Sequence, residues 1–385
     1  MTLFGGFTRV SPNLERLELC RRTAEKRSPI TFKIISGSMP SLKVLGLTSI
    51  DLTPEILKLR HLVNLSLEHI FPSLAAILDL IAANPSLETI ALRVKCAGQT
   101  VPRPAGAVMI PRLRTLEFLF YSPLPLFHHF SIPRGASVSF SLWNNTECEV
   151  VLPDSLEHLR NLWEVKNLYV QRDNRHWIEA SGPSGEVRFE GVCDPLPELR
   201  RLPLYLVEKF RYEEVDQSQK TISKEPDRSW IFNVFCDLRH LRTLVIGSCG
   251  LQVMKEIFIL LSPQTYHIPG VPLRRECFPC PTLSTIIVEV PRDGNWDEWV
   301  VPFLQMLHIR AAAGSRLKKV RIVSRPRVYV PRPGEEKRRW MAKLVPWVEV
   351  KNLWYEKDGM RNERRVRELF EWNHHEAGSG GMSCR

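Results

Sequence analysis

Apolar residues recur in a fixed pattern along the first third of the chain. Segment 13–19 reads Asn-Leu-Glu-Arg-Leu-Glu-Leu, with leucine at its second, fifth and seventh places. The same spacing returns around Leu45, Leu65, Ile90 and Leu116, at intervals of 20 to 28 residues. In the last three places of each copy, two apolar residues flank one polar or small residue. This alternation predicts a short β-strand with one buried face and one exposed face.

The pattern returns later in the chain with less regular spacing. We expect further strands at the following positions: around Val138 to Leu142, around Leu168, Leu244, Ile286 and Val320, and finally over Val350–Tyr355. One such strand cannot bury its apolar face alone, whereas stacked parallel copies form a continuous apolar ladder.

Segments between the strands carry apolar residues at helical spacing. The best example runs from Pro72 to Asn84, where Pro72 suits a first helical turn and Asn84-Pro85 ends the helix. Val253–Leu261 and Asp297–Ala313 show similar spacing. A strand and a returning segment every 20 to 28 residues are typical of leucine-rich repeats. We therefore predict an α/β fold, an irregular leucine-rich-repeat solenoid with parallel strands on the concave side and helices on the convex side.

The repeat region is predicted to span residues 13–372, after an N-terminal segment 1–12 and before a disordered tail 373–385. Its middle, 173–230, is irregular. Within it, Gly, Ser and Glu in 173–191 predict a hairpin-like excursion. We expect the polar segment 213–227 to be a mobile insertion.

The last part of the repeat region, Arg361–Trp372, reads as a charged helix that caps the array. Its apolar residues Val366, Leu369 and Phe370 fall on one helical face.

The composition of the chain limits the cellular compartments in which we expect it. The chain has 385 residues and nine cysteines without regular spacing, which favours reduced thiols. We see no secretory signal and no apolar run long enough to span a membrane. We therefore expect an intracellular protein of the cytoplasm or nucleus that does not enter membranes.

The recurring unit resembles the leucine-rich portion of fungal F-box proteins. The resemblance rests on segments such as 12–19, 40–45 and 84–92, each of which starts with or contains a proline before the leucine pattern. It implies a substrate receptor of a cullin-based ubiquitin ligase, in which an F-box holds an adaptor and the repeats hold the target. No F-box of about 45 residues fits before Leu14. We therefore expect adaptor binding only if an F-box precedes this sequence.

Candidate chemical sites are sparse. Cys277 and Cys280 form one C-x-x-C pair, which supplies half of the four ligands that a zinc site needs. We favour a turn before the strand at Leu283 over a metal or redox site. Nucleotide-binding and nucleophile-elbow motifs are absent from the sequence. We therefore expect no enzyme activity, no metal and no cofactor.

Outward positions on the predicted strands are the better candidates for function. Tyr, Trp and Arg are common at binding hot spots. We select the following residues as a protein-binding surface: Glu68, Arg93, Tyr169, Lys319, Arg321 and Trp354.

Charge suggests the chemistry of the partner. The net charge is +11, and segment 316–343 alone carries eleven Lys or Arg against two Glu. We expect an acidic protein partner. The alternative is a nucleic-acid binder that uses this basic segment, although no nucleic-acid motif supports it.

Overall fold

The structure is a computed structural model of the chain. It describes residues 12–20, 39–50, 52–70, 73–93, 107–120, 129–142, 152–153, 155–172, 176–192, 196–214, 229–247, 249–262, 278–290, 296–324 and 335–352.

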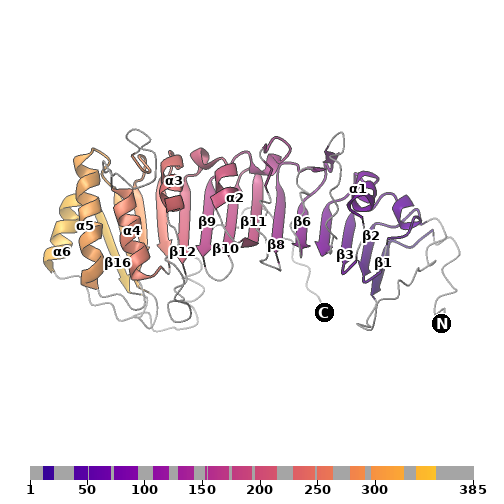
Figure 1. Cartoon of the computed structure of the whole chain (residues 1–385), viewed down its shortest axis with the longest axis horizontal. Helices are drawn as coiled ribbons and strands as arrows, with labels where there is room; N and C mark the ends of the chain where they lie inside the picture. The colour runs from indigo at the N-terminus through magenta and orange to yellow at the C-terminus, as the bar shows by residue number, and fades with distance from the viewer. Residues whose placement is uncertain are drawn as a thin grey trace.

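The described residues form one long sheet of 14 strands (Figure 1). From one end to the other its strands are β1 (Arg16–Cys20), β2 (Val44–Thr48), β3 (Asn64–Glu68), β4 (Thr89–Arg93), β6 (Thr115–Phe120), β8 (Ala136–Leu142), β11 (Gly185–Val192), β10 (His176–Gly182), β9 (Asn167–Arg172), β12 (Lys209–Glu214), β13 (Thr243–Gly247), β14 (Thr285–Glu289), β15 (Lys319–Ser324) and β16 (Trp347–Asn352). A separate pair joins β5 (Val108–Met109) to β7 (Phe130–Ser131).

The register of the first strands follows the sequence pattern. Leu17 pairs with Leu45, Leu45 with Leu65, Leu65 with Ile90, and Ile90 with Leu116, all in parallel. All five side chains are buried. The prediction of stacked parallel repeats is confirmed for this part of the chain.

Two apolar rows run along the inner face of the sheet and form its core. In the second row the rings of Phe118 and Phe140 lie 4.8 Å apart, and those of Phe140 and Phe189 lie 5.5 Å apart. Burial of each such side chain contributes about 1.5–3 kcal/mol to folding. Because each strand of the sheet contributes a side chain to both rows, the core extends without interruption from β1 to β16.

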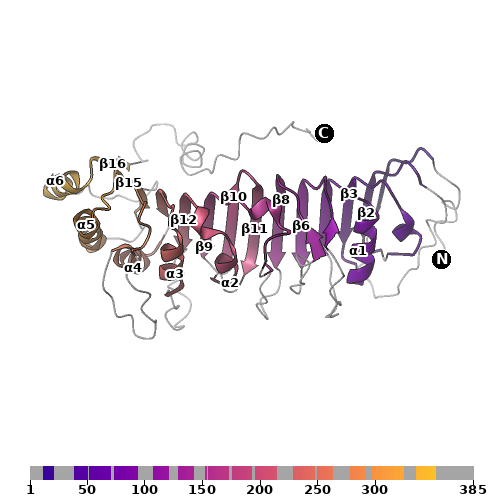
Figure 2. The same ribbon diagram turned by 90° about the horizontal axis from the view of Figure 1, so that it is seen from above.

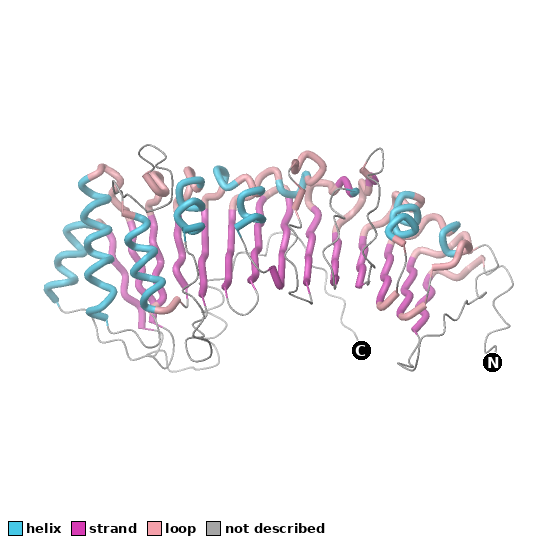
Figure 3. Tube along the Cα trace, viewed as in Figure 1, coloured by secondary structure: helices cyan, strands magenta, loops and turns pink. Residues whose placement is uncertain are grey.

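Helices cover one side of the sheet (Figure 2). They are α1 (Leu74–Ala82), α2 (Leu196–Arg201), α3 (Ser229–Asp237), α4 (Leu251–Leu261), α5 (Trp296–Ala312) and α6 (Glu335–Leu344). Short 3₁₀ helices lie at Ile56–Lys58, Arg160–Leu162 and Leu204–Leu206. The longer helices gather toward the C-terminal end, where α4, α5 and α6 lie side by side (Figure 3). We call the sheet face that points away from the helices the open face.

Helix α1 shows how a returning segment is anchored. It begins at Leu74 after Ser73, whose hydroxyl accepts a hydrogen bond from the Ala76 N–H. The predicted first-turn proline, Pro72, lies outside the described residues. The fully buried Asn84 follows the helix and ties it to the preceding repeat. Its side chain accepts from the N–H of Leu62 and donates to the carbonyls of Leu59 and Leu80.

The irregular middle differs from the predicted excursion. Residues 173–191 do contain a hairpin, β10–β11, but both strands are integral rungs of the sheet. Strand β11 is parallel to β8, whereas β10 is antiparallel to both β11 and β9. The prediction of parallel strands alone is therefore wrong at β10.

The predicted insertion 213–227 is also corrected, because Glu213 and Glu214 belong to strand β12. Residues 215–228 lie outside the described part.

The sequence pattern placed the last repeat five residues too far toward the C-terminus. Val348, and not Leu353, pairs with Val320. Val345-x-x-Val348-x-Val350 fits the pattern equally well.

Residues 353–385, with the predicted helix 361–372, the predicted tail and Trp354, lie outside the described residues.

The expectation that the cysteines are reduced thiols is wrong at one position. Cys20, Cys249 and Cys280 are free thiols, whereas Cys236 is disulfide-bonded.

Candidate protein-binding surface on the open face

Three rows of outward side chains cross the open face. After Glu18 on β1, the middle row carries small residues, Gly46, Ser66 and Ala91, at paired positions on β2, β3 and β4. Toward the centre of the sheet the same row carries larger side chains: Arg188, Glu179, Tyr169 and Arg211. The middle row therefore changes from small residues on β2, β3 and β4 to long polar and aromatic side chains at the centre of the sheet.

The predicted site residues fall into separate groups along this face. Glu68 and Arg93 are paired on β3 and β4 and form an ion pair of 3.2 Å. Lys319 and Arg321 lie on β15, nine strand spacings away from β4 along the sheet, or about 43 Å. Tyr169 lies between these groups, on β9. These residues share one face but cannot contact one small ligand together.

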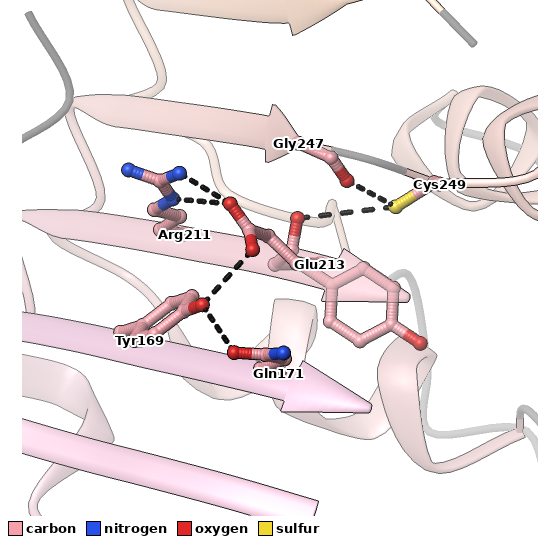
Figure 4. A network of polar contacts seen from close by, with 7 residues as sticks. Tyr169, Gln171, Arg211, Glu213, Gly247 and Cys249 are labelled. Atoms are coloured by element: carbon pink, nitrogen blue, oxygen red, sulfur yellow. Dashed lines mark hydrogen bonds and ion pairs between the residues drawn. The ribbon is translucent and has the colours of Figure 1, made fainter. Parts of the chain in front are cut away.

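Tyr169 is the centre of a partly buried polar network (Figure 4). Its hydroxyl lies 2.9 Å from a carboxylate oxygen of Glu213 and 2.8 Å from the amide oxygen of Gln171. Arg211 binds the other oxygen of Glu213 through Nε at 2.9 Å, and its guanidinium lies 5.4 Å from the Tyr169 ring centre. Burial, followed by the charge of Glu213, raises the Tyr169 pKa above its ordinary value. The tyrosine therefore stays protonated at neutral pH and donates a hydrogen bond.

The neighbouring rungs extend this network. Glu179 faces Tyr169 across β10 and β9, and Arg188 of β11 pairs with Glu179 at 3.2 Å. Arg188 also covers the Trp177 ring, with its guanidinium carbon 4.9 Å from the ring centre. We call Trp177, Glu179, Arg188, Tyr169, Gln171, Arg211 and Glu213 the central cluster. Glu179 and Glu213 are less than a tenth exposed, and buried carboxylates of this kind require cationic or hydrogen-bonding partners.

The next strand is shaped to accommodate the central cluster. A Cβ on Gly247 would lie 2.7 Å from a Glu213 carboxylate oxygen, so the absence of a side chain makes room for Glu213. Just beyond it, the Cys249 thiol lies 2.9 Å from the Gly247 carbonyl oxygen. Burial raises the Cys249 pKa well above its ordinary value. A buried, protonated thiol is a poor nucleophile, which indicates a structural role for Cys249.

A second group of side chains lies near the C-terminal end of the open face. The Lys319 ammonium is 3.9 Å from the ring centre of Trp347. Arg321 donates to Glu349 at 2.7 Å. Trp347 is 42% exposed, so an indole face remains available to a partner. We call Lys319, Arg321, Trp347 and Glu349 the terminal cluster.

The basic segment 316–343 does not present all its charges on one surface. Arg316 donates to the carbonyls of Lys343 and Leu344, where it interacts with the C-terminal end of α6. Lys319 and Arg321 lie on the open face. Residues 325–334 lie outside the described part. Among the described basic residues, charge is thus divided between the open face and α6.

A buried arginine that the sequence analysis did not select organises the same end of the molecule. Arg310 of α5 is fully buried and donates to the carbonyls of Leu261, Pro279 and Cys280, at 2.7 to 3.0 Å. Burial lowers its pKa to about 10. Arg310 therefore remains charged at neutral pH and ties α4, α5 and the turn before β14 together.

Cys280 lies in that turn, as predicted for the residues before Leu283. Its thiol is fully buried 3.3 Å from the Phe235 carbonyl oxygen, and burial raises its pKa to about 12. Cys277 lies outside the described residues. In the part that the structure describes, no group of three or more His, Cys, Asp or Glu side chains is arranged to hold a metal ion.

Of the central cluster, only Tyr169 was among the site residues predicted from the sequence. The signal was present, because Val207-x-x-Phe210-x-Tyr212 repeats the leucine spacing with aromatic residues. All three side chains are fully buried. Reading the aromatics as leucine equivalents would have identified β12 and its outward residues Arg211 and Glu213.

Comparisons with known proteins add little to this picture. No protein-family model matches the sequence, and no curated protein matches it. The crystal structure of an internalin from Listeria monocytogenes matches at 10% identity with a TM-score of 0.29. That match covers 88% of this chain and 81% of the internalin chain. A likeness at this level carries no argument about function.

One further property concerns membranes. Within the described part of the chain, none of the helices is long and apolar enough to cross a bilayer.

Proposed function

We propose that this chain is a protein-interaction module that holds its partner on the open face of the sheet. The observation that supports this proposal most strongly is the pair of clusters on that face, which no described helix covers (Figure 2). They place Trp, Tyr and Arg side chains on a rigid row of strands. These residue types supply most of the energy at protein interfaces, and a rigid scaffold lowers the entropy lost on binding.

The charge of the terminal cluster favours a partner with an acidic surface. Glu349 already neutralises part of the Arg321 charge, whereas Lys319 lies over Trp347. An acidic side chain of the partner can approach Lys319 while an apolar group covers the exposed indole. A nucleic-acid partner is the weaker proposal, because Arg316 and Arg321 are engaged within the chain.

The receptor role in a ubiquitin ligase is a finer proposal. It rests on the resemblance of the repeat units to those of fungal F-box proteins. In that role the open face would hold the protein to be ubiquitinated. Adaptor binding is expected only with an F-box, so we expect the purified chain of this sequence alone not to bind an F-box adaptor. A stable complex of the two in a pull-down would contradict that expectation, and this test is separate from partner binding.

Trp347 provides the sharpest test of the open face. Partners would be captured from the source cells by cross-linking, and the affinity of each purified partner would then be measured. Trp347→Ser should weaken binding about 30-fold, the effect of losing a hot-spot contact of about 2 kcal/mol.

Trp340→Ser is the matched control. Trp340 is 50% exposed on α6, close in exposure to Trp347 but outside the open face. This control should retain full affinity. Equal affinities for the wild type and Trp347→Ser, or a larger loss for Trp340→Ser, would contradict binding at this end of the open face.

A further inference from the structure

Strand β16 is the last strand of the long sheet, and the described part of the chain pairs only one of its two edges. It pairs with β15 on one side, and no described strand lies beyond it. We call its other side the outer edge. An unpaired edge presents a row of backbone N–H and C=O groups that a further strand can bind. Proteins commonly recognise extended segments of other proteins by adding them to such an edge.

The direction of the backbone groups in β16 follows from its neighbours. Lys319 of β15 donates its N–H to the Ser284 carbonyl, on the β14 side. Backbone groups point alternately to the two sides along a strand, and β14, β15 and β16 pair residue by residue. The N–H and C=O groups of Glu349 therefore point toward β15, whereas those of Val348 and Val350 point to the outer edge.

The same two valines leave the end of the core partly exposed. Their partners on β15, Val320 and Ile322, are 0% and 1% exposed. Val348 and Val350 pack against the core but are only partly buried. A strand bound at this edge would bury both side chains, and burial of apolar surface favours association. The outer edge therefore offers backbone hydrogen bonds and an apolar contact together.

The charge at this end of the molecule indicates the chemistry of the added strand. Residues 316–324 and 335–352 carry nine Lys or Arg against three Glu. Of these, Arg339 and Lys343 are exposed on α6. A second copy of the chain would bring the same positive charge to the edge, so repulsion opposes pairing between two β16 strands. Asp and Glu side chains in an added strand are attracted instead.

We propose that the outer edge of β16 binds an extended segment of another protein that is apolar on one side and rich in Asp and Glu. The segment forms backbone hydrogen bonds with Val348 and Val350 and covers their side chains. Its acidic residues lie about 10 Å, or two strand spacings, from Lys319 and Arg321 of the terminal cluster. This contact lies at the end of the sheet and does not depend on whether the open face binds a partner.

Hydrogen exchange at single-residue resolution tests the site in the wild-type chain. The probe is a synthetic peptide of alternating glutamate and valine. The amides of Val348 and Val350 should exchange freely in the chain alone and at least about tenfold more slowly with the peptide. The Glu349 amide, which bonds to β15, is the internal control and should change less. A peptide of alternating lysine and valine should give no such protection, because its charge is not complementary.

Two variants at one position separate the backbone contact from the side-chain contact. Val350→Pro removes an N–H that β15 does not use, a change that edge strands tolerate. It should weaken binding of the glutamate peptide at least about tenfold, because an acceptor in the added strand loses its donor. Val350→Ala keeps this N–H and should weaken binding less.

Several results would overturn the proposal. Protection of Val348 and Val350 in the chain alone would show that the edge is already covered, by the chain itself if protection is independent of protein concentration and by a second copy if it rises with concentration. Absence of protection by the glutamate peptide, equal protection by the two peptides, or equal affinities of Val350→Pro and Val350→Ala would also contradict it. The exchange measurement on the wild type decides the outcome even if Val350→Pro does not fold.

Discussion

Arg310 should be one of the residues on which the C-terminal end of the array depends most. Arg310→Met keeps much of the side-chain length but removes the hydrogen bonds to the carbonyls of Leu261, Pro279 and Cys280 and to the Ser315 hydroxyl. Each buried acceptor left without a donor costs about 1–3 kcal/mol. Relief from burying the guanidinium charge offsets part of that sum. We expect a net loss of about 3–5 kcal/mol in the free energy of unfolding.

The loss should be confined to one end, because repeats contact mainly their neighbours. Urea unfolding followed by circular dichroism would measure the free energy, and hydrogen exchange would locate the change. Amides of α4, α5 and β14 should exchange faster, whereas those of β2, β3 and β4 should not change. Arg316→Met is the control, because Arg316 also donates to two carbonyls but at an exposed site. It should cost less than about 1 kcal/mol.

Two results would refute this reasoning. One is a cost for Arg310→Met no larger than that for Arg316→Met. The other is faster exchange along the whole sheet, which would show that the arginine does not act locally.

Three further substitutions test other parts of the fold. Leu65→Ala empties a site that is 1% exposed and should cost about 2–5 kcal/mol in urea unfolding; a cost below 1 kcal/mol would argue against a packed ladder. Gly185→Ala should cost more than about 2 kcal/mol, because Gly185 has φ 131° and a Cβ would lie 2.5 Å from the Ala136 carbonyl oxygen; an unchanged urea midpoint would contradict that close approach. The Tyr169 pKa is raised by burial and by Glu213, so the unfolded chain releases this proton first, near the ordinary value of 10.0, and stability falls as pH rises past it. In Tyr169→Phe the urea midpoint should therefore fall less between pH 8 and 11 than in the wild type, and equal falls would contradict the shift.

The regular strands were predictable because their pattern is local. Leu45, Leu65 and Ile90 alternate with small or polar residues, and a period of two specifies which side of a strand is buried. The pairing between repeats followed from the near-constant spacing. The strand around Val320, which carries Lys319 and Arg321 outward, was found in the same way.

The missed features depend on contacts between residues far apart in sequence. Arg310 binds carbonyls that are 30 to 49 residues away, and no local pattern marks such a tie. Strand β10 pairs in the reverse direction, although its own alternation gives no sign of direction. The central cluster forms only because this reversal places Glu179 beside Tyr169.

The β10–β11 hairpin also has a consequence for how the chain folds. Its strands are joined by only two residues, Pro183 and Ser184, whereas the parallel neighbours require long crossovers. A hairpin closes in about 1–10 μs, earlier than pairings between distant segments. Once formed, it offers one edge to β8 and another to β9. The array can then grow outward from its middle as two arms that assemble independently, so a lesion that delays one arm leaves a template on which the other still forms.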